Sequence, residues 1–227
     1  MNRTIPPATA APARPSSDVA FTPSVKALQQ RHGSRAAYAR LEARGGWPAE
    51  LDDDVIAFVG DQTGAFLATA SADGQPYIQH RGGPRGFLRV LDRRTIAFAD
   101  FRGNRQYITA GNLAENPRVH LFLIDHARRR RVKLWGTATI VEGDPALLAR
   151  LTDPDYDGVP ERAIVLHVDA WDVNCPQHIP QRLDAGDVAR ALATRDRRIA
   201  ELEARVAELE ATATAAATAA PRPSPPG

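Results

Sequence analysis

The sequence is poor in cysteine and in long apolar runs, and these two shortages exclude whole classes of protein. A single cysteine, Cys175, cannot form an internal disulfide and argues against a zinc cluster, so we expect no metal site and a cytoplasmic location. The longest apolar stretches, such as 121–124, are far shorter than the roughly 20 residues that a membrane-spanning helix needs. The first twenty residues hold four prolines and no continuous apolar run, which excludes a secretory signal.

Aromatic residues and an excess of charge of one sign are also scarce. The net charge is +2, and aromatic residues make up only 6% of the chain and do not interleave with its basic runs. Because proteins that bind nucleic acid usually combine a clustered basic face with aromatic stacking residues, no nucleic-acid partner is expected. With 43% hydrophobic and 25% charged residues, the chain has the composition of one globular domain with appendages.

Shifts in composition divide the chain into four parts. They are a disordered arm (1–20), a compact middle (21–183), a charged helix (184–210) and a disordered tail of Ala, Thr and Pro (211–227). Within the middle, apolar spacing predicts helices over 25–44, 52–59, 107–114 and 145–151, and strands over 65–71, 76–80, 87–90, 95–100, 119–124, 132–142 and 163–171. Many short strands with helices at the margins predict a mainly β fold with peripheral helices, closed as a barrel.

The charged helix carries apolar residues at the spacing of a coiled coil. They are Val188, Leu192, Ile199, Leu202, Val206 and Leu209, and only Arg195 interrupts the series. Two interpretations remain open: an amphipathic helix that lies on its own domain, or a helix that pairs with a partner chain. The heptad spacing favours the second.

Three polar segments at strand ends are candidates for an anion site. In 79–86, paired glycines let backbone amides approach a ligand, although such a stretch is also typical of a plain turn. In 100–107, a strand leads into a helix whose first amides, together with Arg105, suit a phosphate. The alternative there is an Asn cap beside a solvated arginine.

The third segment, 128–136, predicts two cations on one face of a strand. Alternation places Arg131 and Lys133 on one side, with Val132 and Leu134 on the other. Two cations that face the same way favour an anionic ligand. The arginines at 128–130 are instead typical of a solvated hairpin tip.

Together these segments resemble the pyridoxamine 5'-phosphate oxidase-like flavoproteins, a family of FMN-binding split β-barrels. The most specific stretch is TIAFADFRGNRQYITAGNLAENPRV (95–119), which is similar to the family's strand, phosphate turn and helix ending in Asn-Pro-Arg-Val. The resemblance implies that FMN is the cofactor and that the protein is a homodimer in which one subunit completes the pocket of the other. It further implies phosphate contacts from Asn104, Arg105 and Gln106, contacts to the ribityl chain and ring from Gln79, His80 and Arg81, and an approach by Arg131, which replaces a family glutamine.

The substrate is where the sequence departs from the true oxidase. The substrate-binding Arg and Ser residues of that enzyme, and its C-terminal Trp and Arg-Leu-Ala-Pro pattern, have no match here. The segment 172–182 stands in their place and resembles a less characterised branch of the superfamily. It either closes over the flavin or packs beneath Trp171.

These observations predict an FMN-dependent oxidoreductase that acts on an unidentified small molecule, with NAD(P)H or a partner reductase as electron donor. Arg131 or Lys133 is the candidate for stabilising the reduced flavin. His80 and His178 are candidate proton donors, each with a structural role as the alternative, so no catalytic residue is assigned. Cys175 is expected to be a buried, inert thiol. The alternatives are a flavin-binding protein without turnover, or a barrel that binds haem or a deazaflavin.

Overall fold

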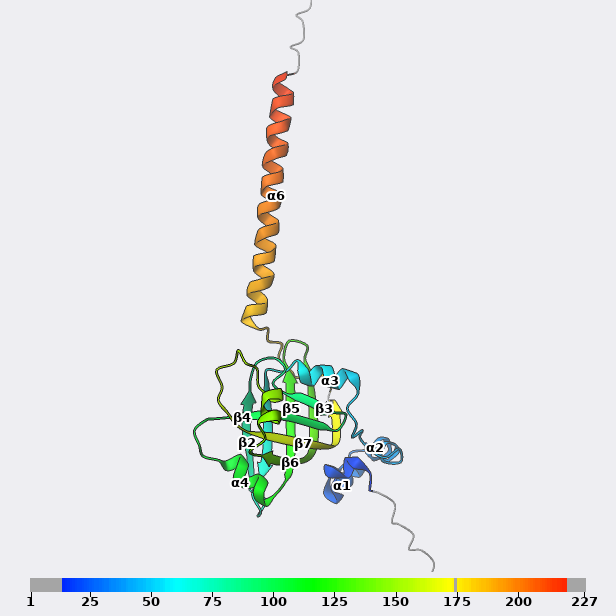
Figure 1. Ribbon diagram of the computed structural model, residues 1–227. Helices are drawn as coiled ribbons and strands as arrows, with labels where there is room; N and C mark the ends of the chain where they lie inside the picture. The colour runs from blue at the N-terminus through cyan, green and yellow to red at the C-terminus, as the bar shows by residue number, and fades with distance from the viewer. Residues whose placement is uncertain (1–13, 174, 220–227) are drawn as a thin grey trace, which may run out of the picture. The chain divides into compact units, whose positions relative to one another are not determined.

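The computed structural model describes residues 14–173 and 175–219 (Figure 1). The chain consists of two compact units, a barrel unit to Ile179 and a second unit from Pro180. The helices of the barrel unit are the 3-10 helix η1 (Ser16–Val19), α1 (Pro23–Arg31), α2 (Arg35–Glu42), α3 (Asp53–Gly60), α4 (Ile108–Glu115) and α5 (Pro145–Leu151). Its strands are β1 (Gly64–Ala70), β2 (Pro76–Gly82), β3 (Arg89–Asp92), β4 (Thr95–Phe101), β5 (Arg118–Asp125), β6 (Arg130–Val141) and β7 (Pro160–Val173). The mainly β prediction is confirmed.

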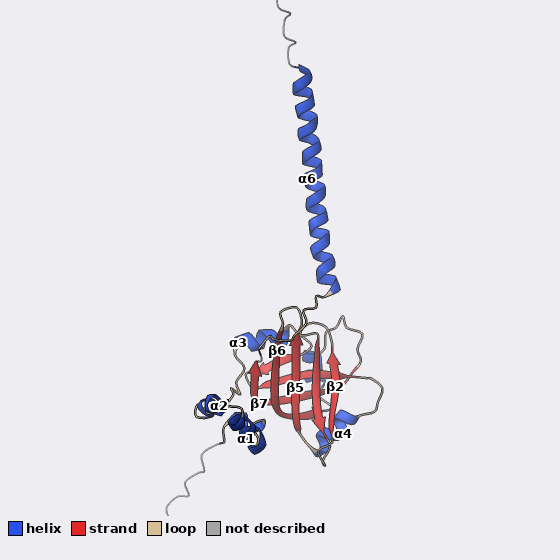
Figure 2. Cartoon of the chain, turned by 180° about the vertical axis from the view of Figure 1, so that it is seen from behind, coloured by secondary structure: helices blue, strands red, loops and turns tan. Residues whose placement is uncertain are grey.

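All seven strands form one antiparallel sheet in the order β2-β1-β5-β6-β7-β4-β3. The sheet curls into a barrel (Figure 2). Because β2 and β3 end the hydrogen-bonded order, the barrel is split between β2 and the β4/β3 pair. In both views α3 lies at one end of the barrel and α4 at the other.

The core follows from strict alternation along the central strands. Val132 and Leu134 of β6 are fully buried, whereas Arg131 and Lys133, which alternate with them, are only partly covered. The predicted two faces of this strand are therefore confirmed. The largest fully buried side chains include Phe98, Leu67, Leu121, Leu134, Ile164 and Leu166.

One tight contact fixes the register of β6 against β7. The ladder shifts between Trp135 and Gly136, and a Cβ at Gly136 would lie 2.0 Å from the carbonyl oxygen of His167. Only glycine allows the two backbones to approach this closely.

The single helix predicted over 25–44 is wrong, because the chain breaks it into α1 and α2. The hydroxyl of Thr22 accepts a hydrogen bond from the N–H of Val25 and begins α1, and Gly33, with a φ of 78°, ends it. A left-handed glycine is the usual helix stop. Ser34 then precedes a second helix that starts in a new direction.

The part of the predicted arm that the structure describes, residues 14–20, is packed and not disordered. Residues 1–13 lie outside the described residues, but Ser16 donates its N–H to the carbonyl oxygen of Gly45 at 2.9 Å, and Ser17 is buried. The packed chain therefore begins before residue 20.

The second unit consists mainly of helix α6 (Ala185–Ala219). The helix begins where the sequence predicts it but continues past residue 210 into the Ala/Thr tract, which we expected to be disordered; 220–227 lie outside the described residues. Among the helices that the structure describes, none is both long and apolar enough to cross a bilayer.

Candidate functional site

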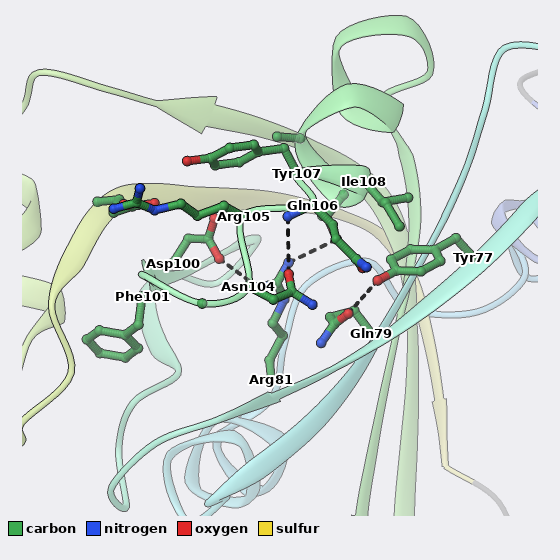
Figure 3. Close-up of a pocket in the computed structure, with 14 residues that line it drawn as sticks. Tyr77, Gln79, Arg81, Asp100, Phe101, Asn104, Arg105, Gln106, Tyr107 and Ile108 are labelled. Carbon is green, nitrogen blue, oxygen red and sulfur yellow. Dashed lines mark hydrogen bonds and ion pairs between the residues drawn. The ribbon is translucent and has the colours of Figure 1, made fainter.

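A pocket of about 200 Å³ lies at the split of the barrel (Figure 3). It is lined by Tyr77, Gln79 and Arg81 of β2, by 100–101 and 103–110 at the end of β4 and the start of α4, and by Glu161 of β7. The three β2 residues share one face because side chains alternate along a strand. They pair with residues of β1 that face the core, so they point to the inside of the barrel.

Arg81 spans the split. Its Nη1 lies 2.6 Å from Asp100 Oδ1 of β4, and its Nη2 donates a hydrogen bond to Thr109 Oγ1 of α4 at 2.9 Å. Its Nε is buried and has no hydrogen-bond partner among the described residues. A buried donor left unpaired costs about 1–3 kcal/mol, so the donor set of this pocket fits a ligand that brings acceptor oxygens.

The loop between β4 and α4 holds a strained backbone. Arg105 and Tyr107 have φ values of 59° and 54°, in the left-handed region that non-glycine residues rarely adopt. Each such residue costs on the order of 1 kcal/mol. Asn104 stabilises the turn, since its Oδ1 accepts a hydrogen bond from the N–H of Gln106 at 3.1 Å.

This strained turn leaves the start of α4 open to the pocket. The N-cap of the helix is Tyr107, which makes no side-chain capping hydrogen bond, and Ile108, Thr109 and Ala110 of the first turn line the pocket. The first N–H groups of a helix have no partner within the helix and carry a partial positive charge. Such an uncapped end is suited to an anionic group.

The carboxylates around the pocket are already matched by arginines. Asp100 pairs with Arg81 and lies 3.6 Å from Arg162 Nε, while Glu161 lies 3.0 Å from Arg102 Nε. The hydrogen bond from Arg102, followed by that from Arg162, lowers the pKa of the Glu161 carboxyl, so Glu161 is ionised at neutral pH. These acids therefore leave no net negative charge at the site.

Arg105 also lines the pocket but takes no part in these ion pairs. Within 14–173 and 175–219 it makes no ion pair, and its side chain is exposed on the loop. Figure 3 shows it on the far side of Asn104 from Tyr77 and Gln79. The pocket thus has a polar end at Gln79 and a cationic end at Arg105.

The structure brings five of the eight predicted site residues into this pocket: Gln79, Arg81, Asn104, Arg105 and Gln106. The other three, His80, Arg131 and Lys133, lie on outward-facing positions of β2 and β6 and do not line it in one copy of the chain.

The surroundings of these outward residues explain their placement. The ring of His80 lies edge-on to Phe66, with centroids 5.5 Å apart. The ammonium of Lys133 lies 3.0 Å from Asp172 Oδ2 and 5.2 Å from the centroid of the Trp135 ring. Lys133 therefore already has a counter-ion on its own chain.

Sequence reasoning missed several residues of the pocket. Tyr77, whose hydroxyl donates a hydrogen bond to Gln79, is two positions before it, and the period of a strand could have identified it. Thr109 and Glu161 enter through the pairing of distant segments, which no local pattern in the sequence indicates. Asp100 begins the candidate segment 100–107, but its ion pair with Arg81 depends on the same long-range contacts.

The segment after β7 contributes nothing to this pocket in the barrel unit. None of residues 175–179 lines it, although Ile179 itself is buried. The expectation that Cys175 is a buried thiol is wrong, because its side chain is exposed. His178 is also exposed.

Comparison with known proteins identifies the family. Residues 51–175, more than half of the chain and the part that holds the whole pocket, match the family described as pyridoxamine 5'-phosphate oxidase. The chain belongs to this family. The barrel unit of this pyridoxamine 5'-phosphate oxidase family member is thus the split β-barrel that the resemblance implied. A comparison with curated proteins found no match.

Similar solved structures are distant from this family member. HupZ from Group A Streptococcus is 20% identical, over 59% of this chain and 99% of its own, with a TM-score of 0.46. An FMN-binding protein from Syntrophomonas wolfei is 12% identical, over 64% of this chain and 97% of its own, with a TM-score of 0.41. An F420 reductase is 23% identical, over 51% and 94%, with a TM-score of 0.38. The family assignment rests on the sequence match.

Proposed function

We propose that this family member binds FMN at the split of its barrel and uses it in the oxidation or reduction of a small molecule. The observation that carries the proposal is the set of donors left over at one pocket: the buried Nε of Arg81, the unpaired cation of Arg105 and the uncapped start of α4. These donors suit a ligand with a phosphate and hydroxyl groups. A phosphorylated ribityl chain has both.

The five predicted residues that line the pocket each have a role in this proposal. Asn104 holds the turn, while Arg105, Gln106 and the first amides of α4 hold the phosphate. Gln79 and Arg81 face the ribityl chain and the edge of the ring. Bound flavin would supply the redox chemistry, and the protein would position it and exclude water from it. No side-chain nucleophile is needed.

A second copy of the chain completes the site in this proposal. The pocket of about 200 Å³ is smaller than the roughly 300–1,000 Å³ of most cofactor sites. The outward face of β1 and β2 carries apolar side chains in water, with Ile78 62% exposed and Phe66 37% exposed. We propose that this face meets a second copy, so that His80 and Arg131 reach the cofactor across the interface.

Cofactor preference is the first test of this function. The purified full-length chain is titrated separately with FMN, haem and a deazaflavin, and each Kd is measured by the change in ligand absorbance. Tight binding of FMN alone supports the proposal, and preference for haem or the deazaflavin overturns it. The FMN-loaded protein is then mixed with NADH or NADPH without oxygen; bleaching of the flavin supports an oxidoreductase, whereas stable colour with every donor tried indicates a flavin-binding protein without turnover.

The proposed setting is the cytoplasm, where electrons are available from NAD(P)H or a reductase. An exposed single thiol at Cys175 is compatible with a reducing compartment.

A further inference from the structure

Helix α6 carries an apolar stripe that is exposed to water and is interrupted once, by Arg195. Its 35 residues include six large apolar side chains, each between 38% and 53% exposed: Val188, Leu192, Ile199, Leu202, Val206 and Leu209. A large exposed apolar stripe on a helix is typical of an interaction surface.

The stripe has the residue types of a two-stranded coiled coil. In the heptad notation abcdefg, Leu192, Ile199 and Val206 occupy successive a positions, and Leu202 and Leu209 occupy d positions. β-Branched residues at a combined with leucine at d favour a parallel pair of helices. The last two heptads follow this rule at every core position.

The charges beside the stripe select both the partner and its direction. Arg198 and Arg205 occupy g positions, and Glu203 and Glu210 occupy e positions. In a parallel, in-register pair of identical helices, g faces the e position five residues further along the other helix. Arg198 then faces Glu203 of the second copy, and Arg205 faces Glu210 of the second copy. An antiparallel pair would place arginine against arginine and glutamate against glutamate.

The one charged residue within the stripe fixes the register. Arg195 occupies a d position, and its long side chain can reach water at the edge of the seam when it meets its own equivalent. A shift by one heptad would place one Arg195 against Leu202 of the other copy and the second Arg195 against Val188 of the first. Each cation would then be buried against an apolar side chain, and the two would no longer share one site at the edge of the seam. A single polar core residue commonly specifies register in this way.

We infer that α6 pairs with α6 of a second copy of this chain as a parallel, in-register coiled coil over 188–209. This inference goes beyond the proposed function and does not depend on FMN. It joins two copies through equivalent positions of their C-terminal units.

Disulfide trapping tests the direction and register directly. In a Cys175→Ser chain of full length, one variant carries Leu209→Cys at a d position and a matched control carries Ala211→Cys at the neighbouring outward f position. Mild oxidation is expected to convert the Leu209→Cys chain to a covalent dimer about tenfold faster than the control, because equivalent d positions meet across a parallel pair whereas f positions point away from the partner helix. Because residue 209 is near one end of the stripe, an antiparallel pair would keep the two thiols apart. Equal rates for the two variants overturn the inference.

Charge reversal in the same Leu209→Cys chain tests the role of the flanking residues. Glu203→Arg with Glu210→Arg puts arginine on both sides of the seam and is expected to slow cross-linking by about tenfold. Adding Arg198→Glu and Arg205→Glu restores opposite charges and is expected to restore the rate. A cross-linking rate that is unchanged by Glu203→Arg with Glu210→Arg, or that stays low after Arg198→Glu and Arg205→Glu are added, contradicts the proposed pairing.

Discussion

Replacing Arg105 with methionine removes the one guanidinium at the pocket that has no ion pair among the described residues, while keeping a Cβ in the same left-handed turn. Its proposed contact is a charge-assisted hydrogen bond to the FMN phosphate, which contributes roughly 1.5–3 kcal/mol. Losing it should therefore raise the Kd for FMN by roughly ten- to a hundredfold. The fold should be unaffected, since the side chain is exposed and holds nothing in place.

The assay is quenching of flavin fluorescence on binding, measured with FMN and with riboflavin, which lacks the phosphate. The matched control is Arg102→Met, which removes the same charge from the same loop. Arg102 is 51% exposed and does not line the pocket, and its partner Glu161 keeps a second ion pair with Arg162, so the loss of Arg102 should change the Kd by about twofold or less. The Kd for riboflavin should be the same in the original chain and in both variants.

Two results would refute the phosphate assignment. Equal loss of FMN and riboflavin affinity in Arg105→Met would place the effect on the ring or on the fold. An equal loss of FMN affinity in the Arg105→Met and Arg102→Met variants would show that any positive charge near the pocket has the same effect, and not a specific contact of Arg105 with the phosphate.

Three further predictions concern stability. Asp52→Ala removes the carboxylate that caps α3 and should cost about 1 kcal/mol in denaturant unfolding. Gly136→Ala puts a Cβ against the His167 carbonyl and should cost at least about 2 kcal/mol in the same assay, or fail to fold. Burial, and secondarily the charge of Lys133, lower the pKa of His120 in the folded protein, so the unfolded chain binds a proton at a higher pH than the folded one. The contribution of His120 to the free energy of unfolding should therefore be full above about pH 6.5 and fall as the pH drops below it. His120→Gln should flatten this dependence on pH. A pH profile unchanged by the substitution would contradict that account.

The strands of this barrel were predictable because their signals are local. Asp73 and Gly74 mark the turn between β1 and β2, and Gly74 has the positive φ that such a turn requires. Alternation along β6 likewise separated buried from outward side chains. The turn 104–106 could be placed at the start of a helix for the same reason.

The errors have physical causes too. Gly33 and Ser34, residue types that commonly end and begin helices, indicate the break between α1 and α2. The apolar spacing on either side of them nevertheless led to the prediction of a single helix. The Ala/Thr tract at 211–219 was taken for a disordered tail because it lacks an apolar stripe, although alanine has the highest helix propensity.

The candidate site was predictable only in its local parts. Residues 104–106 follow one another in the chain, and their surroundings could be inferred from the strand before them and the helix after them. The bridge from Arg81 to Asp100 depends on how a curled sheet brings β2 beside β4. The outward position of Lys133 was readable from alternation, but its pairing with Asp172 required the β6–β7 register.

The most direct test of the central claim is the identity of the small molecule that the protein carries. An absorption spectrum of the freshly purified full-length chain is recorded, the protein is denatured, and the released compound is identified by mass. The account predicts a yellow protein that releases FMN. A colourless protein that also fails to take up added FMN, or one that releases haem or a deazaflavin, would contradict it.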